Sequence, residues 1–523
     1  MHSPLTPLEF ARRARRCYPH REAVVDGSWR LTYAQFLDRC DRWSAALQKL
    51  GVRPGDRVAV IAPNTHAHLE AYYAVPQIGA IIVPINYRLS ADDFAYIINH
   101  CGATSVCADP AYLDTVDRIR SQVTGVRHFV VFDGSRPGWL SYEELLASTQ
   151  PAFEAVPIQE HEPLSINYTS GTTARPKGVV LTHRNIYLNI LGRLAHTHMT
   201  AADRYLWTLP MFHVNGWCFV WTVTAVGGKH VCLPRPDPQA ILELLEREGI
   251  TMFCAAPTVL IGITNAPEEL RRRAPRGVRV LTAGAPPAAA TIQQVEGNMG
   301  WSVTHVYGLT EVSPIVTICE PRPEDRDLDA TTAARLKARQ GVECLAAGEV
   351  LVVDDEGHEV PHDGHTMGEV VMRGHAVMTG YYNDPEATGR AFRDGWFHSG
   401  DAAVVHPDGY LEIRDRWKDV IISGGENISS VEVEGILLQH PAVLEAAVVG
   451  LPHKKWGEAP HAFVVLRAGA SLSLTDLRSF CRDHLAHFKV PQEFHLIAEL
   501  PKTATGKIRK FILRGGKPNL AAR

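Results

Sequence analysis

Short apolar runs alternate with longer stretches of helical periodicity over the first two-thirds of the chain. The apolar runs have the length and the β-branched content of buried strands, and the stretches between them are long enough for helices. Two such helical stretches are Asp92–His100 and Gln239–Glu248. This alternation predicts an α/β fold with mostly parallel sheets. The expected strands are Arg57–Ile61, His128–Phe132, Leu164–Tyr168, Gly178–Leu181, His230–Leu233, Thr251–Ala255, Val278–Thr282 and Val303–Tyr307.

The pattern changes after about residue 345. Expected strands Gly348–Val353, Gly368–Gly374 and Gly409–Ile413 occur among the turn sequences DDEG, NDPE and HPDG. Such turns are typical of antiparallel hairpins. We therefore expect a β-barrel-like part that follows the parallel sheets within one large N-terminal domain.

The C-terminal part has its own pattern of expected helices and strands. Helices are expected at Val431–His440 and Leu474–Leu485, with strands at Val443–Gly450 and His461–Arg467. Roughly a hundred residues of this kind suit a small α+β domain. The charged sequence RDRWKD, residues 414–419, is typical of a solvent-exposed connector. We predict an N-terminal domain of residues 1–417 and a small, mobile C-terminal domain of residues 418–523.

Composition and charge exclude several classes of protein. The chain has 523 residues, enough to bury a large core, and its hydrophobic content of 45% is ordinary for a globular protein. A net charge of −4 gives no electrostatic footprint for nucleic acid. No apolar run is long enough to span a bilayer. We expect neither nucleic-acid binding nor integral membrane association.

The ten cysteines are scattered and form no CxxC or Cys/His knuckle spacing. This distribution favours reduced thiols in a cytoplasmic protein over a metal site or a disulfide framework. The sequence ARRARR at Ala11–Arg16 follows Glu9, and we interpret it as the polar face of a first helix rather than a transit peptide. Residues Leu520–Arg523 are not a peroxisomal address.

The sequence YTSGTTARPKG, residues 168–178, has the composition of a phosphate-binding loop. Small residues let backbone amides approach phosphate oxygens, and a lysine neutralises their charge. The order of residues is not that of a Walker A motif, and a polar loop between two strands is the alternative interpretation. The candidate phosphate ligands are Thr169, Ser170, Gly171, Thr172, Thr173 and Lys177.

This loop resembles the phosphate loop of the adenylate-forming superfamily, which includes acyl-CoA synthetases, adenylation domains of peptide synthetases and luciferases. Ala174 departs from many relatives, which have glycine there, and alanine disfavours a positive φ. The resemblance extends over essentially the whole chain. The other matching segments, in order, are LPMFHVNGW (209–217), TAGAP (282–286), YGLTE (307–311), SGDAAVVHPDGYLEIRDRWKDVIISGGENISSVEVE (399–434) and PKTATGKIRK (501–510).

The resemblance implies ATP-dependent activation of a carboxylate, in which the acid attacks the α-phosphate and pyrophosphate leaves. Lys507 is implied as the adenylation lysine, and His213 as a gate to the acyl pocket. Glu311 would hold Mg²⁺ together with Thr169, while Thr310 would contact phosphate. Without the resemblance, Lys507 would be taken for a surface lysine and Glu311 for a helix-capping carboxylate.

The same resemblance implies the nucleotide site. Asp401 would accept hydrogen bonds from the ribose hydroxyls, Arg416 would contact ribose or phosphate, and Tyr307 would lie against the adenine. A turn aspartate and a buried tyrosine at a strand end are the alternative interpretations. The remaining residues implied at this site are Gly284, Ala285, Pro286 and Gly308.

A second half-reaction would use coenzyme A. The resemblance places Ser423, Gly424, Gly425 and Trp456 along the pantetheine channel, although a turn and a core tryptophan would explain the same residues. Lys418 matches the hinge about which the C-terminal domain rotates between the two half-reactions.

The segments around the acyl pocket are most similar to plant acyl-activating enzymes, benzoate–CoA ligases and methylmercaptopropionate–CoA ligases. This similarity implies a short- to medium-chain, branched, thioether or aromatic acid. The pocket candidates include no lysine or arginine, so a monocarboxylate is expected; Trp221 is more typical of core packing. These candidates are His213, Val214, Trp217, Ala283, Gly308, Val312 and Ser313.

The expected function is therefore that of an ATP- and Mg²⁺-dependent acid–CoA ligase. The alternatives are a stand-alone adenylating enzyme that loads a carrier protein and a non-catalytic protein that binds nucleotide only. A luciferase has little support, and no carrier domain follows within the 523 residues. The expected partners are a small carboxylic acid, ATP and coenzyme A, with a homodimer and a monomer as alternative states of the chain.

Overall fold

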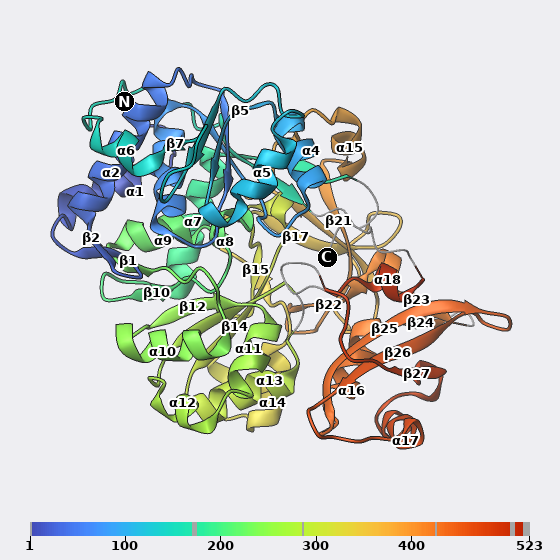
Figure 1. The fold of residues 1–523 in the computed structure, drawn as a ribbon. Helices are drawn as coiled ribbons and strands as arrows, with labels where there is room; N and C mark the ends of the chain where they lie inside the picture. The colour runs from blue at the N-terminus through green and yellow to red at the C-terminus, as the bar shows by residue number, and fades with distance from the viewer. Residues whose placement is uncertain (1–2, 170–174, 285–286, 424–425, 503–507, 516–523) are drawn as a thin grey trace.

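The computed structural model describes residues 3–169, 175–284, 287–423, 426–502 and 508–515. These residues form two large mixed sheets, one smaller antiparallel sheet and a separate C-terminal sheet (Figure 1). The expected α/β class with a small C-terminal α+β unit is confirmed.

The first large sheet has nine strands. Its central strands, from β14 to β1, run parallel, and antiparallel strands extend it at both edges. In order across the sheet they are β16 (Val342–Glu343), β15 (Thr317–Ile318), β14 (Ser302–Tyr307), β13 (Arg279–Thr282), β12 (Met252–Ala255), β10 (Arg204–Leu206), β11 (Lys229–Val231), β1 (Glu22–Asp26) and β2 (Trp29–Thr32).

The second large sheet has eight strands. The strands from β8 to β7 run parallel, and β9 and β19 add an antiparallel edge. In order they are β19 (Gly380–Tyr381), β9 (Lys177–Thr182), β8 (Pro163–Thr169), β4 (Ile81–Pro84), β3 (Arg57–Ile61), β5 (Ala103–Ala108), β6 (His128–Val131) and β7 (Leu140–Ser141).

The largest hydrophobic core takes residues from both large sheets, for example Val60 of β3 and Leu281 of β13. Helices contribute to this core and to two further cores on the other faces of the sheets. The main core contains residues of α1 (Leu8–Cys17), α2 (Tyr33–Lys49), α3 (His66–Ala74), α6 (Tyr142–Ala147), α7 (His183–Thr197), α8 (Val214–Trp217) and α9 (Phe219–Val226). On the other face of the eight-stranded sheet lie α4 (Ala91–Cys101) and α5 (Leu113–Ile119). On the other face of the nine-stranded sheet lie α10 (Pro238–Glu248), α11 (Pro257–Thr264), α12 (Glu268–Arg273), α13 (Ala289–Gln294) and α14 (Ala330–Lys337).

The third sheet is antiparallel, as the hairpin turns predict. The expected strand Gly409–Ile413 is displaced, because Gly409 has a φ of +80° in the turn and the strand begins two residues later. The strands are β17 (Glu349–Val353), β18 (Gly368–Arg373), β21 (Trp396–Val405), β20 (Phe392–Arg393) and β22 (Leu411–Arg416), and α15 (Pro385–Ala391) precedes β20.

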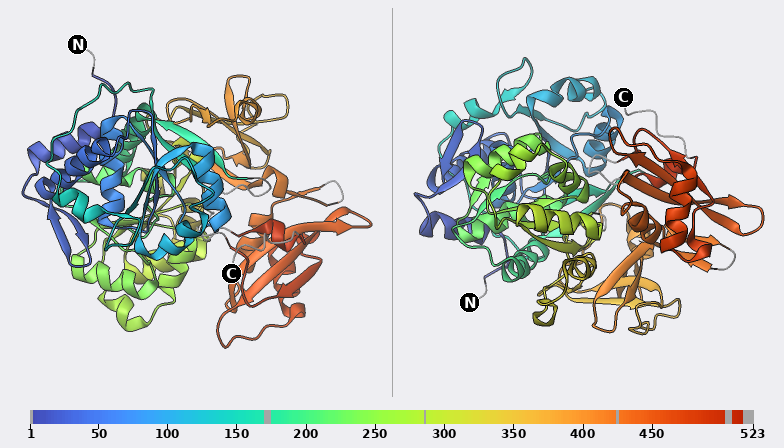
Figure 2. Two further views of the ribbon diagram at one scale, coloured as in Figure 1. Left: turned by 45° about the horizontal axis from the view of Figure 1, so that its top comes forward. Right: turned by 90° about the horizontal axis from the view of Figure 1, so that it is seen from below.

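The C-terminal residues form a lobe with a hydrophobic core of its own. Figure 2 shows this orange-to-red lobe beside the rest of the molecule in both views. The expected strands are longer than predicted and form one hairpin, β25 with β26. The lobe contains β23 (Ile421–Ser423), β24 (Glu426–Ile428), α16 (Ser430–Leu437), β25 (Val443–His453), β26 (Gly457–Leu466), α17 (Leu474–His484), β27 (Glu493–Leu496) and α18 (Lys510–Leu513).

The expectation of a solvent-exposed connector at residues 414–419 is wrong for its first half. Arg414–Arg416 are the last residues of β22, and Asp415 is only 4% exposed. Its carboxylate accepts hydrogen bonds from the backbone N–H of Ser430, at 2.9 Å, and from the Ser430 hydroxyl. A buried carboxylate needs such hydrogen-bond donors. Asp415 therefore links the end of β22 to the start of α16 in the C-terminal lobe.

All ten cysteines are free thiols, and nine of them are buried. The basic sequence near the N-terminus lies in α1, whose Ala11 and Ala14 are buried, as expected for one face of a helix. Within the described residues, no helix has both the length and the apolar character to cross a membrane.

Candidate active site

The predicted site residues gather where strands of both large sheets end. Thr169 ends β8 of the eight-stranded sheet, and Tyr307 ends β14 of the nine-stranded sheet. Gly284 follows β13, with a φ of +90° that favours glycine. In open α/β sheets, ligands bind outside the carboxyl ends of the strands. The two sheets thus present their ligand-binding edges to one region.

Tyr307, Asp401 and Arg416 are in direct contact. The Tyr307 hydroxyl donates to Asp401 Oδ2 at 2.6 Å, and Arg416 Nε lies 2.8 Å from Asp401 Oδ1. Asp401 is 3% exposed and stands opposite Arg416 in the antiparallel pairing of β21 with β22. The register therefore sets the ion pair, and β14 brings the tyrosine to it.

The charge states in this group follow from burial and from the carboxylate. Burial and the nearby Asp401 both raise the pKa of Tyr307 well above its ordinary value. Burial lowers the pKa of Arg416, but the surrounding acidic groups, Asp401 first among them, together outweigh it, and the net shift is upward. From the described residues, each oxygen of Asp401 receives one donor, whereas a carboxylate offers about four acceptor positions. Asp401 can therefore still accept hydrogen bonds from two hydroxyls.

A second group consists of Lys177, Tyr381 and Glu311. Lys177 begins β9 opposite Thr169, and its Nζ lies 4.7 Å from the centre of the Tyr381 ring. The Tyr381 hydroxyl donates to Glu311 Oε1 at 2.9 Å. Burial and the charge of Glu311 raise the pKa of this tyrosine, so it remains a donor.

Tyr381 was not among the predicted site residues. It belongs to β19, a strand of two residues that pairs with β9 beside Lys177. In the sequence, the only indication of Tyr381 as a site residue was its place in GYYNDPE, and the last four residues of that segment were interpreted as a turn. Tyr381 lies between a candidate phosphate ligand and a candidate metal ligand, so it is a further candidate site residue, one that the pairing at the sheet edge reveals.

Thr310 and Glu311 lie in a single 3₁₀ turn, Thr310–Val312, which follows β14. The Met378 N–H donates to the Glu311 carbonyl at 2.8 Å, which holds this turn against the segment before β19. Gly308 is required before the turn, because a Cβ there would lie 1.9 Å from the Pro314 carbonyl oxygen. The glycine of YGLTE thus sets the close packing that places Glu311.

The oxygens near this turn suit a magnesium ion. Mg²⁺ prefers carboxylate, hydroxyl and water oxygens, and it usually takes one or two protein carboxylates. Glu311 and Thr169 are both half-buried, and Glu311 shares one oxygen with Tyr381. These residues fit the cofactor that the resemblance implies.

His213 immediately precedes α8, and α8 has an unusual backbone. Val214, Asn215 and Trp217 all have positive φ angles between 37° and 52°. Gly216 is confined, because a Cβ there would lie 2.5 Å from the ring of Trp207. Positive φ is costly for such residues and persists where the surroundings impose it, most often at ligand sites.

Two contacts fix this segment beside the Glu311 turn. The Asn215 amide donates to Ser165 Oγ at 2.8 Å, and the Cys218 thiol donates to the Ser313 carbonyl at 3.3 Å. Trp217 is 5% exposed, whereas Trp221 is fully buried and its indole N–H donates to the Tyr72 carbonyl. Trp221 is therefore a core residue.

Ser423 and Trp456 lie close together in the C-terminal lobe. Ser423 pairs with Gly457, which follows Trp456 directly in the turn between β25 and β26. The Trp456 ring is half-buried and stacks on His453 with ring centres 4.4 Å apart. It does not join the hydrophobic core of the lobe formed by the described residues.

Other sequence predictions fall outside the described residues, so their placement stays a prediction. Of Lys418, only the backbone is described, in the 3₁₀ turn Trp417–Asp419. The residues outside the description are Ser170, Gly171, Thr172, Thr173, Ala285, Pro286, Gly424, Gly425 and Lys507.

The described residues on either side of Lys507 contact one another and the rest of the lobe. Lys502 and Ile508 form an antiparallel bridge, and the Arg509 N–H donates to the Pro501 carbonyl at 2.8 Å. Lys510 Nζ lies 2.8 Å from Glu434 Oε1. Burial lowers the pKa of Lys510, but the nearby carboxylates, Glu434 first and then Asp415 and Asp419, together outweigh it and raise the pKa overall.

Family models agree with this organisation. The model described as AMP-binding enzyme matches residues 10–382, and the model described as AMP-binding enzyme C-terminal domain matches residues 432–507. The chain belongs to the AMP-binding enzyme family. It is an AMP-forming acid–thiol ligase, with ATP, coenzyme A and a carboxylic acid as substrates and Mg²⁺ as cofactor.

Relatives of this ligase are similar over nearly their whole length. Acetate–CoA ligase CCL3 of Humulus lupulus is 42% identical, over 100% of this chain and 96% of the relative. The peroxisomal benzoate–CoA ligase of Arabidopsis thaliana is 41% identical, over 98% and 93%. The crystal structure of the anthranilate CoA ligase AuaEII with anthranoyl-AMP has a TM-score of 0.89 and 26% identity, with 98% of each chain covered.

Proposed function

We propose that this ligase activates an apolar monocarboxylic acid of short to medium length, branched, thioether or aromatic acids included, and transfers it to coenzyme A. The observation that carries the proposal is the pair of contact groups at the strand ends. Tyr307, Asp401 and Arg416 suit a ribose, while Lys177, Tyr381 and Glu311 suit phosphates with their metal ion.

The first half-reaction joins the acid to AMP. A carboxylate oxygen attacks the α-phosphorus of ATP, and the bond to the pyrophosphate oxygen breaks. Asp401 accepts hydrogen bonds from the ribose hydroxyls, and Arg416 neutralises the charge of Asp401 and of nearby phosphate. Lys177 binds the departing phosphates, and Mg²⁺ at Glu311 and Thr169 would supply further positive charge there. Positioning and electrostatic stabilisation account for most of the catalysis in such a reaction.

Lys507 is proposed to neutralise the charge that develops between the carboxylate and the α-phosphate. A lysine can do this only when it is placed over the site. The bridge between Lys502 and Ile508 joins the described residues on either side of Lys507, and the Lys502–Glu445 and Lys510–Glu434 ion pairs attach these residues to the C-terminal lobe. The position of the lobe would then control the first half-reaction.

The acid would occupy the space beside the Glu311 turn. The Cys218–Ser313 hydrogen bond holds α8 against that turn, and Trp217 of α8 is large and almost fully buried. A tryptophan there shortens the space available to an acyl chain. That acetate and benzoate ligases are relatives supports a small or planar acid.

The second half-reaction replaces AMP by coenzyme A. The thiolate sulfur attacks the acyl carbon, and the bond from that carbon to the AMP phosphate oxygen breaks. We propose that domains 1–417 and 418–523 rotate about Lys418, so that Ser423, Gly424, Gly425 and Trp456 line the thiol's path. The pairing of Ser423 with Gly457 supports a shared wall for this path.

We propose that the ligase acts in the cytoplasm, because its free thiols suit a reducing compartment. The name of the Arabidopsis benzoate relative includes the peroxisome, so the compartment needs its own measurement. A fluorescent fusion, imaged beside peroxisomal and cytoplasmic markers, provides it. Co-localisation with the peroxisomal marker would overturn the proposal.

An acid panel tests the substrate class. Acetate, butyrate, 2-methylpropanoate, benzoate and cinnamate are assayed for AMP release with coenzyme A, with octadecanoate and malonate as controls. We expect turnover with at least one acid of the first group and little with either control. The Trp217→Ala variant should extend the accepted length, and Trp221→Phe serves as its matched control.

The same assay separates a coenzyme A ligase from an enzyme that loads a carrier protein. Coenzyme A is replaced by a phosphopantetheinylated carrier protein, and acylated product is measured by mass spectrometry. Thioester formation with the carrier protein but not with coenzyme A would overturn the proposal. In the acid panel, faster AMP release with octadecanoate than with every short acid would also overturn it.

A further inference from the structure

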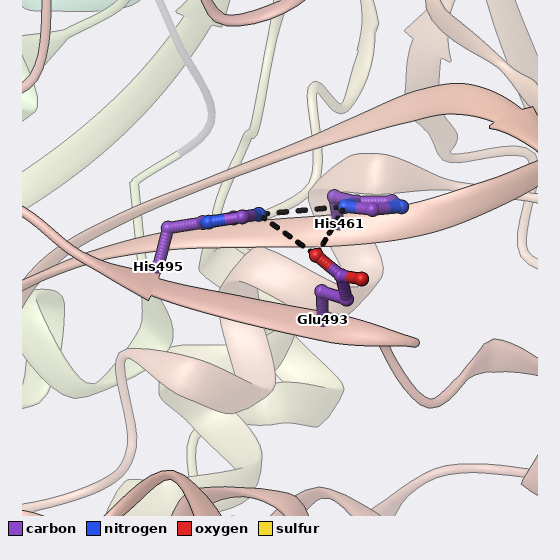
Figure 3. A group of neighbouring side chains, drawn as sticks. All are labelled: His461, Glu493 and His495. Carbon is purple, nitrogen blue, oxygen red and sulfur yellow. Dashed lines mark hydrogen bonds and ion pairs between the residues drawn. The ribbon is translucent and has the colours of Figure 1, made fainter.

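His461, Glu493 and His495 form a compact group on the C-terminal lobe. The first belongs to β26 and the other two to β27, which runs parallel to β26. His461 pairs with Glu493, and Phe463, two residues further on, pairs with His495. Side chains two residues apart on a strand point to the same face, so all three lie on one face of this sheet. Figure 3 shows their polar atoms turned toward one another.

The separations of the three polar atoms are nearly equal. His461 Nδ1 lies 3.4 Å from His495 Nε2, and each of these nitrogens lies 3.8 Å from Glu493 Oε2. Direct hydrogen bonds between such atoms are usually about 2.7–3.2 Å long. A point equidistant from three atoms with these separations is about 2.1 Å from each, within the usual zinc–nitrogen and zinc–oxygen bond lengths of about 2.0–2.2 Å.

The donor set selects a class of metal. Two imidazole nitrogens and one carboxylate oxygen suit zinc and its neighbours cobalt, nickel and copper, whereas Mg²⁺ and Ca²⁺ prefer oxygen ligands alone. Glu493 and His495 have side chains 64% and 36% exposed, so a dication can enter from solvent. Water would complete a four-coordinate sphere, as in zinc sites with three protein ligands.

Packing around the group limits the movement of two ligands. The His495 ring stacks on Phe463 with ring centres 4.5 Å apart, and Phe494 between the two β27 ligands is buried in the core of the lobe. The Gln492 N–H donates to the Pro460 carbonyl at 2.8 Å, which fixes the start of β27 against β26. Ligands on paired strands are held more closely than ligands on loops.

We propose that His461, Glu493 and His495 bind one transition-metal dication of the zinc class. The metal would join β27, which has a single partner strand among the described residues, to β26. Metal binding to the folded state alone would stabilise the C-terminal lobe against unfolding. The site does not involve the residues proposed for ATP, the acid or coenzyme A.

The test uses untagged full-length protein, freed of metal by a chelator and dialysed. Zn²⁺ is titrated calorimetrically without nucleotide, and Co²⁺ binding is followed by its visible absorption. We expect one Zn²⁺ per chain and a Co²⁺ spectrum of a four- or five-coordinate site. His461→Ala and His495→Ala should each weaken Zn²⁺ binding by at least about a hundredfold, because even the loss of a residue that only orients a ligand costs 10- to 100-fold. Glu493→Gln should weaken it by roughly tenfold.

The matched control is His484→Ala, which removes an exposed histidine of α17 in the same lobe. It should bind Zn²⁺ like the unmodified protein. Circular dichroism and metal-free thermal unfolding verify that each variant is folded, and a 100-fold excess of Mg²⁺ should not displace Co²⁺. Zn²⁺ binding that is unchanged in both histidine variants would overturn the proposal, as would the absence of any saturable binding to the unmodified protein.

Discussion

Two partly buried ion pairs lie on either side of residue 418, and they use their polar atoms differently. Asp401 and Arg416 meet at the strand ends of the large N-terminal part, and Asp401 retains acceptor positions for a ligand. Glu434 and Lys510 meet inside the C-terminal lobe, where Glu434 also accepts from the Val448 N–H at 2.7 Å.

The second pair is part of a chain of contacts that serves architecture. Lys510 also donates to the Ser430 hydroxyl, which in turn donates to Asp415 of β22. This chain connects α16, the segment after Lys507 and the end of β22. We therefore assign the pair near the strand ends to binding and the hydrogen-bonded pair inside the lobe to folding, as a hypothesis. The predictions below test this division.

The largest effect is expected from Lys507→Ala, because it removes the positive charge proposed at the reacting atoms. Adenylation, measured as pyrophosphate exchange, should fall by roughly a thousandfold, the upper range for loss of one group that stabilises a transition state. Thioester formation from presynthesised acyl-adenylate should change little. Lys454→Ala, at an exposed lysine of the same lobe, is the control. Equal loss of both half-reactions would contradict the assignment of Lys507 to the first.

The next effect concerns the pair that we assign to binding. Asp401→Asn should lower kcat/KM for ATP by roughly a hundredfold, because hydrogen bonds to a charged group contribute about 1.5–3 kcal/mol each. Glu349→Gln, in an exposed ion pair of the same sheet, should leave kcat/KM within twofold. A normal KM for ATP in Asp401→Asn would place the ribose elsewhere.

For the pair that we assign to architecture, Glu434→Gln should mainly destabilise the lobe. Removing one partner of a buried ion pair leaves a buried charge and costs about 3 kcal/mol. Chemical unfolding should show this loss, while affinity for ATP is retained. Glu432→Gln on the same helix breaks a half-exposed pair with Lys489 and should cost less than about 1 kcal/mol. Similar losses in the two variants would refute the distinction.

The smallest effect is expected from Tyr381→Phe, which removes one hydroxyl from Glu311 and keeps the ring beside Lys177. Activity should fall by roughly tenfold, which corresponds to about 1.5 kcal/mol, the lower end for a hydrogen bond to a charged group. Raising the Mg²⁺ concentration should recover part of the loss if Glu311 holds the ion. The neighbouring Tyr382→Phe is the control, and an equal response of both variants would exclude a specific role for Tyr381.

The sequence was most informative for elements that their own local residues determine. Residues Arg57–Ile61 form β3 as predicted, because a short β-branched run between turns has few other structures available. Asp415 was placed wrongly, since its charge indicates exposure and its partner Ser430 lies beyond the predicted boundary. Local patterns cannot reveal partners that folding brings together.

The site was predicted as a set of residues but not as an arrangement. The resemblance named Tyr307 and Asp401, but their hydrogen bond joins residues 94 positions apart, from two different sheets. Tyr381 was missed because its role depends on a two-residue strand at a sheet edge. Motifs identify residue types at fixed spacing, whereas these contacts depend on the pairing of distant strands.

The buried thiols have a consequence for an enzyme that makes reactive acyl groups. Acyl-adenylates and thioesters acylate thiolates, and Cys218 directly follows the segment proposed to line the acid pocket. Burial raises the pKa of Cys218 to about 12, and its S–H is engaged by the Ser313 carbonyl. A thiol kept protonated and hydrogen-bonded is a poor nucleophile. We therefore expect Cys218 to resist acylation by the activated acid, which leaves coenzyme A as the better thiol acceptor.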